Sequence, residues 1–597
     1  MQTGMEEINR LTLAEFVARF GAIYEHSPWV AEAAFVAQPF ASLAALKLAL
    51  ARAVEAADEG RKRDLLNAHP ELAGKLAIAG KLGQHSSAEQ AGVGLHLCTP
   101  EEFTRLHELN EAYRSKFGFP FIIAVKGDHG LGLSRADIIA DCARRLENDA
   151  ETEFAESLYQ VKRIAEMRLD TLFGVSPAAG QTILARAQSL AAHSDEPAQL
   201  SVSYLSPAHQ AVAAQLMSWM EQAGMRVWQD AVGNVVGRYA KEAPEGSVRK
   251  TLLIGSHYDT VKNGGRYDGR LGILLGIAAV QILHEEGCHL PFDIEVIGFA
   301  DEEGVRFQST FLGSRALAGN FNPALLEKTD AQGVSMREAL QQAGLDAQEV
   351  VNLARDPARL AGYLEAHIEQ GPVLLQADMP LGVVTSIAGC SRFLLELRGQ
   401  AGHAGTAPMN MRRDSAAAAA EIVLAVEQIC SSYHGRAVGT VGQLMVEQGS
   451  INVVPGKTRL SLDLRSGEEK IRYNLVQQVL NACDRICKRR RIELVLQPVL
   501  DQAATPCNAQ LQNVLAQAIA DSGLPVMKLA SGAGHDAMCM ARITPIAMLF
   551  VRCGHGGVSH HPLESMTAHD AELALSVMLQ ALRNWPVEIA QEEGMAA

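Results

Sequence analysis

The stretch TLLIGSHYDT, residues 251–260, is a short apolar run that ends in side chains able to bind a metal. A second such run, FDIEVIGFADEEG at residues 292–304, follows the helix-like segment GILLGIAAVQILHEEG at residues 272–287. Short apolar runs that alternate with helices are typical of βαβ units, whose strands form a mostly parallel sheet. The sequence therefore predicts an α/β domain around these segments.

A smaller unit interrupts the α/β pattern between residues 390 and 501. Its segments follow the order strand, helix, strand, strand, helix, strand, from RFLLELRG at residues 392–399 to IELVLQPVL at residues 492–500. This order is typical of a ferredoxin-like fold. Because the apolar run PIAMLFV at residues 545–551 resumes the first pattern, we predict that residues 390–501 are inserted into one larger α/β domain of residues 182–389 and 502–597.

The first 173 residues have a different pattern. Apolar residues recur there at helical spacing, as in LAALKLALARAVEAAD at residues 43–58, and no long alternating strand pattern occurs. We predict an all-α domain over residues 1–173. The small residues and proline of GVSPAAGQ, residues 174–181, predict a linker. A chain of 597 residues is also too long for one hydrophobic core, which favours several folding units.

Composition narrows the class of partner. The net charge of -15 argues against nucleic acid and anionic membranes, because both need clustered Lys and Arg, and favours small-molecule substrates. The N-terminus resembles no signal peptide, and no apolar run has the roughly 18 residues of a membrane span. The scattered cysteines predict reduced thiols in a cytoplasmic protein. Cys483 and Cys487, at i,i+4 spacing, fit a soft metal site less well than a buried helix face.

Metal-capable side chains follow the predicted strands of the α/β domain. His257 ends one strand, and Asp259 lies two residues on, where it can orient the imidazole. Asp268 lies in a glycine-flanked turn before a helix, and Glu302 and Glu303 end the next strand. A mixed set of His and carboxylates suits two zinc or manganese ions, with Asp268 as the bridge and Glu302 as the general base. Such a site can hydrolyse an amide or ureido group.

Further motifs follow in order: HIEQG at 367–371, GHAGTAPMNMRRD at 402–414, INVVPG at 451–456, SGAGHDA at 531–537 and GVSHHPLE at 557–564. With these, the chain from about Gln181 to its end resembles the M20 metallopeptidase-like amidohydrolases that act on allantoate, N-carbamoyl-L-amino acids and ureidopropionate. The resemblance implies one ion on His257, Asp268 and His367 and a second on Asp268, Glu303 and His560, with Glu302 as the base.

The same resemblance implies that residues 390–501 form a lid and dimerisation domain on a catalytic domain of residues 182–389 and 502–597, and it implies roles for residues of this lid. His403 would polarise the scissile group, while Asn452 and Arg465 would hold the substrate carboxylate, often across the interface of a homodimer. Gln370 would add a polar substrate contact. His561 is an alternative to His560 as a ligand, and His535 fits a packed loop histidine equally well.

The helical part contains unusual runs of its own, at residues 23–32 (IYEHSPWVAE), 67–75 (NAHPELAGK), 86–92 (SSAEQAG) and 103–127. Composition alone is compatible with a non-catalytic module. These runs, however, resemble 2-oxo-4-hydroxy-4-carboxy-5-ureidoimidazoline (OHCU) decarboxylase, a family that needs no cofactor. Glu71 stands where many relatives have aspartate. The resemblance implies catalysis by His69, Glu89 and Arg163, in a pocket lined by Pro70, Ser86, Gln90, Phe121 and Ile122.

Both resemblances concern the breakdown of urate. They predict a bifunctional enzyme that decarboxylates OHCU to S-allantoin and hydrolyses allantoate to ureidoglycine, ammonia and carbon dioxide. The alternative is an N-carbamoyl-L-amino acid hydrolase or ureidopropionase that carries a non-catalytic helical assembly module.

Overall fold

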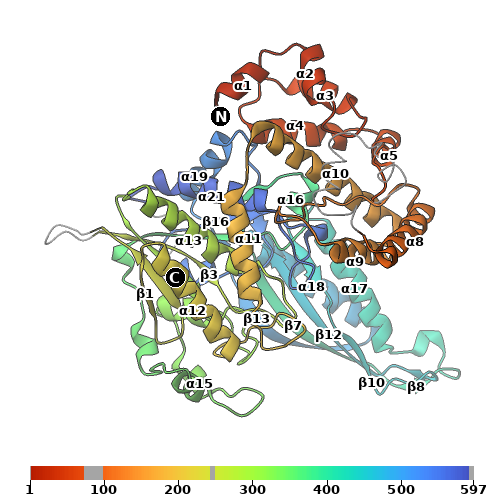
Figure 1. The fold of residues 1–597 in the computed structure, drawn as a ribbon. Helices are drawn as coiled ribbons and strands as arrows, with labels where there is room; N and C mark the ends of the chain where they lie inside the picture. Colours follow the sequence, from red (N-terminus) through yellow and green to blue (C-terminus); the bar gives the residue numbers. More distant parts are fainter. Residues whose placement is uncertain (1, 73–97, 242–248, 590–597) are drawn as a thin grey trace. The chain divides into compact units, whose positions relative to one another are not determined.

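The structure is a computed structural model that describes residues 2–72, 98–241 and 249–589 (Figure 1). The chain forms two compact units. The first comprises Met1–Gly382, Asn513–Met527 and Leu549–Ile589, and the second comprises Val383–Gln512 and Lys528–Met548. Among the described residues, no helix is both long and apolar enough to cross a membrane.

The first unit begins with the predicted helical region, coloured red to orange in Figure 1. Side chains cap several of its helices: Thr99 and Glu102 form a capping box at the start of α8, and Asp149 caps α10. The helices bury a common core that includes Phe16, Leu65 and Tyr113. The region contains α1 (Gln2–Ile8), α2 (Leu13–Phe20), α3 (Trp29–Ala34), α4 (Leu43–Glu55), α5 (Glu59–Asn67), α8 (Pro100–Phe117), α9 (Arg135–Arg145) and α10 (Ala150–Phe173).

Helix α11 (Ala178–Ala191) begins inside the segment predicted as a linker. Gly180 lies in its first turn, where the backbone N–H donates to Glu572 at 2.7 Å. A Cβ at Gly180 would overlap the backbone of Ala568 in α21 (Ala568–Arg583), so the helix packs closely against α21. The small residues of this segment therefore serve helix packing, which composition alone does not distinguish from a flexible connection.

The α/β part of the first unit is built on a mixed sheet with the strand order β1-β2-β4-β3-β5-β16. The central strands β3 (Thr251–His257), β4 (Asp293–Phe299) and β5 (Leu360–Ile368) are parallel and buried along their whole length. Strands β1 (Arg226–Gln229) and β2 (Val235–Tyr239) form an antiparallel hairpin at the edge, because only a short turn joins them. The sheet is accordingly less parallel than the apolar runs predicted.

Helices bury the faces of these strands. Helix α13 (Arg270–Glu285) follows β3 and is buried for most of its length, which explains why its sequence is apolar nearly all round. The remaining elements of this part are α12 (Pro207–Gln222), α14 (Leu312–Leu317), α15 (Met336–Gln342), α16 (Val373–Gln376), α19 (Ala509–Asp521) and β16 (Ile546–Val551), the last two running across the boundary between the units.

The second unit contains a sheet with the strand order β10-β12-β7-β13, in which β9 also pairs with β12. In β12 (Lys457–Ser466) buried residues alternate with more exposed ones, and Leu460, Leu462 and Leu464 join the core beside Cys483 and Cys487. Burial raises the pKa of Cys483 to about 12 and that of Cys487 to about 11, as expected of a packed helix face. The other main elements are β7 (Gly389–Arg398), α17 (Ser415–Ser431), β9 (Val438–Thr440), β10 (Leu444–Glu447), α18 (Glu469–Arg490) and β13 (Glu493–Gln502).

Candidate metal centre

The parallel strands of the first unit carry the first predicted ligands to one edge of the sheet. His257 is the last residue of β3, and His367 lies near the end of the neighbouring β5. Because the carboxyl ends of parallel strands meet at one edge, both imidazoles reach the same crevice. Asp268 lies in the turn before α13, where a Cβ at the next residue, Gly269, would overlap the ring of His257. The glycine lets this turn pass close to the imidazole.

Asp268 lies at the centre of two groups of side chains. Its Oδ1 is 3.2 Å from His367 Nε2 and 3.7 Å from His257 Nε2, whereas its Oδ2 is 3.0 Å from His560 Nε2. His560 Nε2 is also 3.4 Å from Glu303 Oε1. Within each group, the possible ligand atoms all lie within 4.8 Å of one another. The five side chains predicted as ligands thus converge, and one carboxylate is common to both groups.

The tautomers of the two buried histidines suit a cation. His367 Nδ1 is 2.8 Å from the carbonyl oxygen of Ile368, and His257 Nδ1 is 3.1 Å from that of Asp259. Because a carbonyl oxygen only accepts, each Nδ1 carries a hydrogen, so a ring that is neutral has its lone pair on the Nε2 that faces Asp268. His367 Nε2 also accepts the backbone N–H of Gly269 at 3.2 Å. Imidazole lone pairs aimed at a carboxylate fit a divalent ion between them.

The buried carboxylates at the centre also favour a bound divalent cation. Burial, together with repulsion from Asp268 and Asp259, raises the pKa of Glu303 to about 7. Uncompensated buried carboxylates cost several kcal/mol each, and divalent cations are a common compensation. Borderline ions such as zinc and manganese accept a donor set of His and carboxylates.

Asp259 ties the first histidine to the acidic pair. Its Oδ1 lies 3.3 Å from His257 Nδ1 and accepts the backbone N–H of Glu302 at 3.0 Å, while its Oδ2 accepts that of Glu303 at 3.2 Å. The carboxylate groups of Glu302 and Glu303 also have oxygens within 4.8 Å of a nitrogen of His257. Asp259 therefore orients the imidazole of His257 and holds the backbone segment that carries Glu302, the predicted base.

We expect Asp259→Asn to weaken metal binding by about 10–100-fold, as does the loss of other groups that orient a ligand. The asparagine amide would place its own N–H against a backbone N–H of Glu302 or Glu303, which now donates to the carboxylate. Equilibrium dialysis followed by elemental analysis would measure the loss, with the melting temperature recorded on the same sample. Unchanged affinity in Asp259→Asn would contradict this orienting role.

Gln370 contacts the centre in a way that its motif did not predict, whereas the contact of His560 is the predicted one. Gln370, predicted to contact substrate, donates from Nε2 to both oxygens of Asp268 at 3.1 Å. Of the two adjacent histidines, His560 faces Asp268, whereas His561 accepts the backbone N–H of Leu563 at 3.1 Å through Nδ1. The geometry thus separates His560 from its neighbour.

Glu564 was not singled out from the sequence, although its motif was. Its carboxylate accepts the backbone N–H groups of Tyr267 and Asp268, at 2.8 and 3.1 Å. The hydroxyl of Ser559 also donates to it, at 2.8 Å. An isolated acidic residue in a loop carries no signal of such contacts, because they depend on a segment almost 300 positions away.

The predicted lid residues belong to the second unit. His403 on β8 (Gly402–His403) pairs with Val453 on β11 (Val453–Val454), and the carbonyl of Asn452 accepts the N–H of Ala404 at 2.9 Å. Arg465 donates to Asp463 at 2.8 Å and to the carbonyl of Gly532 at 2.8 Å. His535 is buried, and its Nε2 lies 2.8 Å from Ser531 Oγ. The structure thus places His403 beside Asn452, while their roles stay predictions.

The residues predicted for decarboxylation are described only in part, because Ser86, Glu89 and Gln90 lie outside the described residues. His69 is buried after α5, with Nδ1 2.9 Å from the carbonyl oxygen of Leu65. Phe121 and Ile122 belong to the helical core, and Pro70 is half-buried. Arg163 on α10 donates to Asp128 and, at 3.0 Å, to the carbonyl of Gly127.

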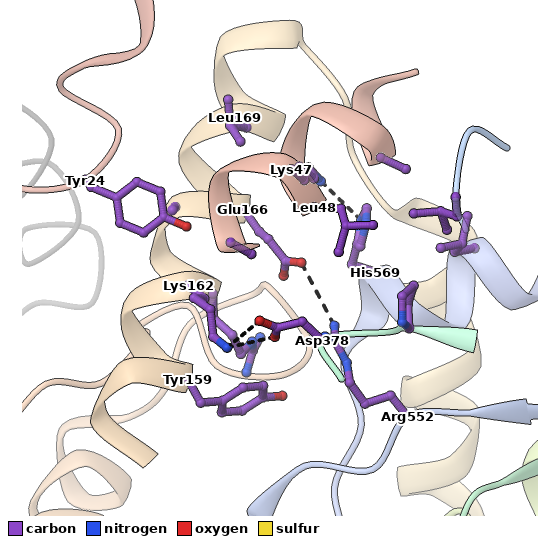
Figure 2. Close-up of a pocket in the computed structure, with 17 residues that line it drawn as sticks. Tyr24, Lys47, Leu48, Tyr159, Lys162, Glu166, Leu169, Asp378, Arg552 and His569 are labelled. Atoms are coloured by element: carbon purple, nitrogen blue, oxygen red, sulfur yellow. Dashed lines mark hydrogen bonds and ion pairs between the residues drawn. The ribbon is translucent and has the colours of Figure 1, made fainter. Parts of the chain in front are cut away.

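Arg163 also lines a small cavity within the first unit (Figure 2). Its volume of about 40 Å³ suffices for little more than a water molecule. The charged side chains around it are engaged with one another: Lys162 is 2.7 Å from Asp378, and Arg552 is 4.0 Å from Glu166, as the dashed lines show. The cavity is therefore too small and too well paired for a substrate site.

Comparisons with known proteins match the N-terminal part of the chain and the larger remainder to different families. The family model "OHCU decarboxylase" matches residues 9–170, and "Peptidase family M20/M25/M40" matches residues 253–584. The N-carbamoyl-L-amino acid amidohydrolase of Geobacillus stearothermophilus is 41% identical over 63% of this chain and 90% of its own length. Allantoate deiminase 1 of Glycine max is 40% identical over 67% and 88%.

A solved structure supports the same assignment. The crystal structure of a hydantoinase/carbamoylase family amidase from Burkholderia multivorans matches with a TM-score of 0.63 and 28% identity, covering 69% of this chain and 98% of the amidase. The chain therefore belongs to the M20/M25/M40 peptidase family and carries an OHCU decarboxylase domain in residues 9–170.

Proposed function

We propose that the larger part of the chain hydrolyses allantoate to ureidoglycine, ammonia and carbon dioxide. The observation that carries this proposal is the position of Asp268 between the pair His257 and His367 and the pair Glu303 and His560. Two divalent ions held by these residues would polarise the ureido carbonyl and lower the pKa of a bound water. Overall, one water is consumed for each allantoate.

The residues of the chain supply the remaining steps. Glu302 takes the proton of the attacking water and returns it to the leaving nitrogen, as a general base and then a general acid. Asp259 keeps the backbone of Glu302 in place through the hydrogen bond from its N–H. In the proposed mechanism, His403 polarises the scissile group while Asn452, Arg465 and Gln370 bind the substrate.

The choice of allantoate rests on the neighbouring domain. The relatives in the comparisons include both allantoate deiminases and N-carbamoyl-L-amino acid amidohydrolases at similar identity, so their names alone do not select a substrate. OHCU decarboxylation and allantoate hydrolysis both belong to the breakdown of urate, which favours allantoate for a chain that also carries an OHCU decarboxylase domain. An N-carbamoyl-L-amino acid hydrolase is the second candidate, because 41% identity supports it.

A side-by-side assay on the full chain would distinguish the two substrates. Ammonia release from allantoate, N-carbamoyl-L-amino acids and 3-ureidopropionate would be followed at equal concentrations with saturating manganese or zinc. We expect allantoate to have the highest kcat/KM. A higher kcat/KM for a carbamoyl amino acid would select the second candidate, and activity that survives complete chelation would reject the metal mechanism.

The helical part is proposed to decarboxylate OHCU to S-allantoin, with His69 exchanging a proton with the substrate. This half of the proposal is tested by the decay of freshly generated OHCU, followed by absorbance and circular dichroism. We expect the chain to accelerate the decay and to yield optically active allantoin, and His69→Ala to abolish both effects. A decay rate and product chirality unchanged by the wild-type chain would leave the helical part as a non-catalytic module.

Residues 390–501, within the second unit, are proposed as a ferredoxin-like lid that also forms a homodimer. The strand order β10-β12-β7-β13, combined with α17 and α18, supports this assignment. Sedimentation of the full chain would show whether it is a dimer. Mixing His403→Ala chains with Glu302→Gln chains would restore activity only if the histidine acts across the interface.

A further inference from the structure

A single buried carboxylate connects the two loops that carry Asp268 and His560. The side chain of Glu564 is almost fully buried, with the residue 4% exposed. Its Oε1 accepts the backbone N–H groups of Tyr267 and Asp268 at 2.8 and 3.1 Å, and its Oε2 accepts the hydroxyl of Ser559 at 2.8 Å. Because Ser559 immediately precedes His560, one side chain fixes both the bridging aspartate and the neighbour of a histidine predicted as a ligand.

The loop around the aspartate leaves room for this carboxylate. A Cβ on Gly265 would overlap the carboxylate of Glu564, so a larger residue there would displace it. The backbone N–H groups of two successive residues then point at one oxygen. An acceptor with three donors is a well-satisfied buried group, which is the condition under which a buried carboxylate orders its surroundings.

The ligands differ in how firmly the fold holds them. His257 and His367 lie on buried central strands, and both are at least 95% buried. The side chain of His560 is 48% exposed, and its backbone has φ +56°, in a loop where Gly556 and Gly557 also have positive φ. A loop residue in this left-handed region gains no support from regular hydrogen bonding. Its position depends on the contacts that tie the loop down.

Contacts from several residues tie this loop to the centre. Gly557 packs against the segment after Gln370, where a Cβ would overlap the carbonyl of Gly371. Glu564 accepts the two backbone N–H groups of the Asp268 turn, and the hydroxyl of Ser559 also lies 3.3 Å from Asp268 Oδ2. Asp268 has further support, since Gln370 donates to both of its oxygens at 3.1 Å. Gln370 Nε2 also lies 3.4 Å from His560 Nε2, but the His560 side chain is half exposed and its backbone is left-handed. Loss of Glu564 should therefore release His560 more than it releases Asp268.

We propose that Glu564 is a positioning residue that holds His560 against Asp268 and thereby sets the affinity for the second ion. It touches neither substrate nor ion. Its effect falls on the group formed by Asp268, Glu303 and His560, and the group formed by His257, Asp268 and His367 keeps its ion. The inference rests on the proposed two-ion centre.

The test uses Glu564→Leu and Glu564→Gln in the full chain. Leucine has a similar size but accepts no hydrogen bond, whereas glutamine keeps one oxygen for the two backbone donors. Asp230→Leu is a matched control, because Asp230 is also a buried carboxylate that accepts two backbone N–H groups, of Val232 and Asn234, plus one side-chain donor. His257→Ala and His560→Ala serve as references for loss of the first and the second ion.

Manganese bound at equilibrium is measured against free manganese for every variant, with melting temperatures on the same samples. We expect Glu564→Leu to bind the second ion about 10–100-fold more weakly than the wild type and to bind the first ion within about threefold of the wild type. The loss should thus fall on the same ion as in His560→Ala. Glu564→Gln should lie between Glu564→Leu and the wild type, and Asp230→Leu should bind both ions normally.

Three results are decisive. Wild-type affinity for both ions in Glu564→Leu would overturn the inference, as would an equal loss of both ions or a binding curve like that of His257→Ala. If Glu564→Leu fails to fold, Glu564→Gln decides by the same comparison. A wild-type chain that binds fewer than two ions would instead overturn the proposed two-ion centre, so the two failures are distinguishable.

Discussion

Glu302→Gln should lower kcat for allantoate by about 10²–10⁴-fold while both ions stay bound. The amide cannot take the proton of the attacking water, and loss of a positioned general base costs this much. The side chain is the same size, and the backbone N–H that donates to Asp259 at 3.0 Å is unchanged, so the strand end should keep its geometry. Initial rates of ammonia release, with metal content measured on the same preparation, would check this result.

The adjacent residue provides the control. Glu303 lies 3.4 Å from His560 Nε2, so Glu303→Gln should weaken the second ion, and its rate should recover in part at high metal concentration. Glu302→Gln should show no such recovery. If Glu302→Gln retained more than about a tenth of the wild-type kcat, another residue would have to be the base.

Asp268→Asn should have the largest effect on metal binding, because it changes both groups at once. The aspartate oxygens lie 3.2 Å from His367 Nε2 on one side and 3.0 Å from His560 Nε2 on the other. In Asp268→Asn a neutral amide with one oxygen replaces the charged bridging carboxylate. The affinities for both ions should therefore fall further than the loss of about 10–100-fold that follows when a hydrogen bond to a ligand is removed. Hydrolysis of allantoate should become undetectable.

Two further variants show whether Asp268 bridges both ions or serves only one of them. His367→Ala should affect mainly the first ion and His560→Ala mainly the second, as measured by metal titration of each variant. A selective loss of one ion in Asp268→Asn would show that the aspartate serves a single site. The proposed decarboxylation should be unaffected in all three variants, which reports on the integrity of the rest of the chain.

The convergence of the site was predictable because its ligands follow strands. His257 and His367 end or nearly end two parallel strands, and strand ends of this kind meet at one edge whatever the rest of the fold does. The apolar run before His257 and the family motifs were enough to place them. The helical region was predictable for a similar local reason, since its apolar spacing and capping residues act over only a few positions.

Contacts between distant segments could not be predicted in the same way. Glu564 binds the backbone of Tyr267 and Asp268, and Gln370 contacts Asp268, through hydrogen bonds with no periodicity to reveal them. Helix α11 begins in a segment whose small residues resemble a linker, and its partner α21 is almost 400 positions away. In each case the deciding partner is far away in sequence or lies in the backbone.

The most direct test of the central claim is electron paramagnetic resonance of the manganese-loaded chain. If Asp268 bridges the two ions, a sample with two manganese ions per chain should give the spectrum of an exchange-coupled pair, and Asp268→Asn should not. A wild-type chain that binds two ions and gives only the spectrum of isolated manganese would contradict the account.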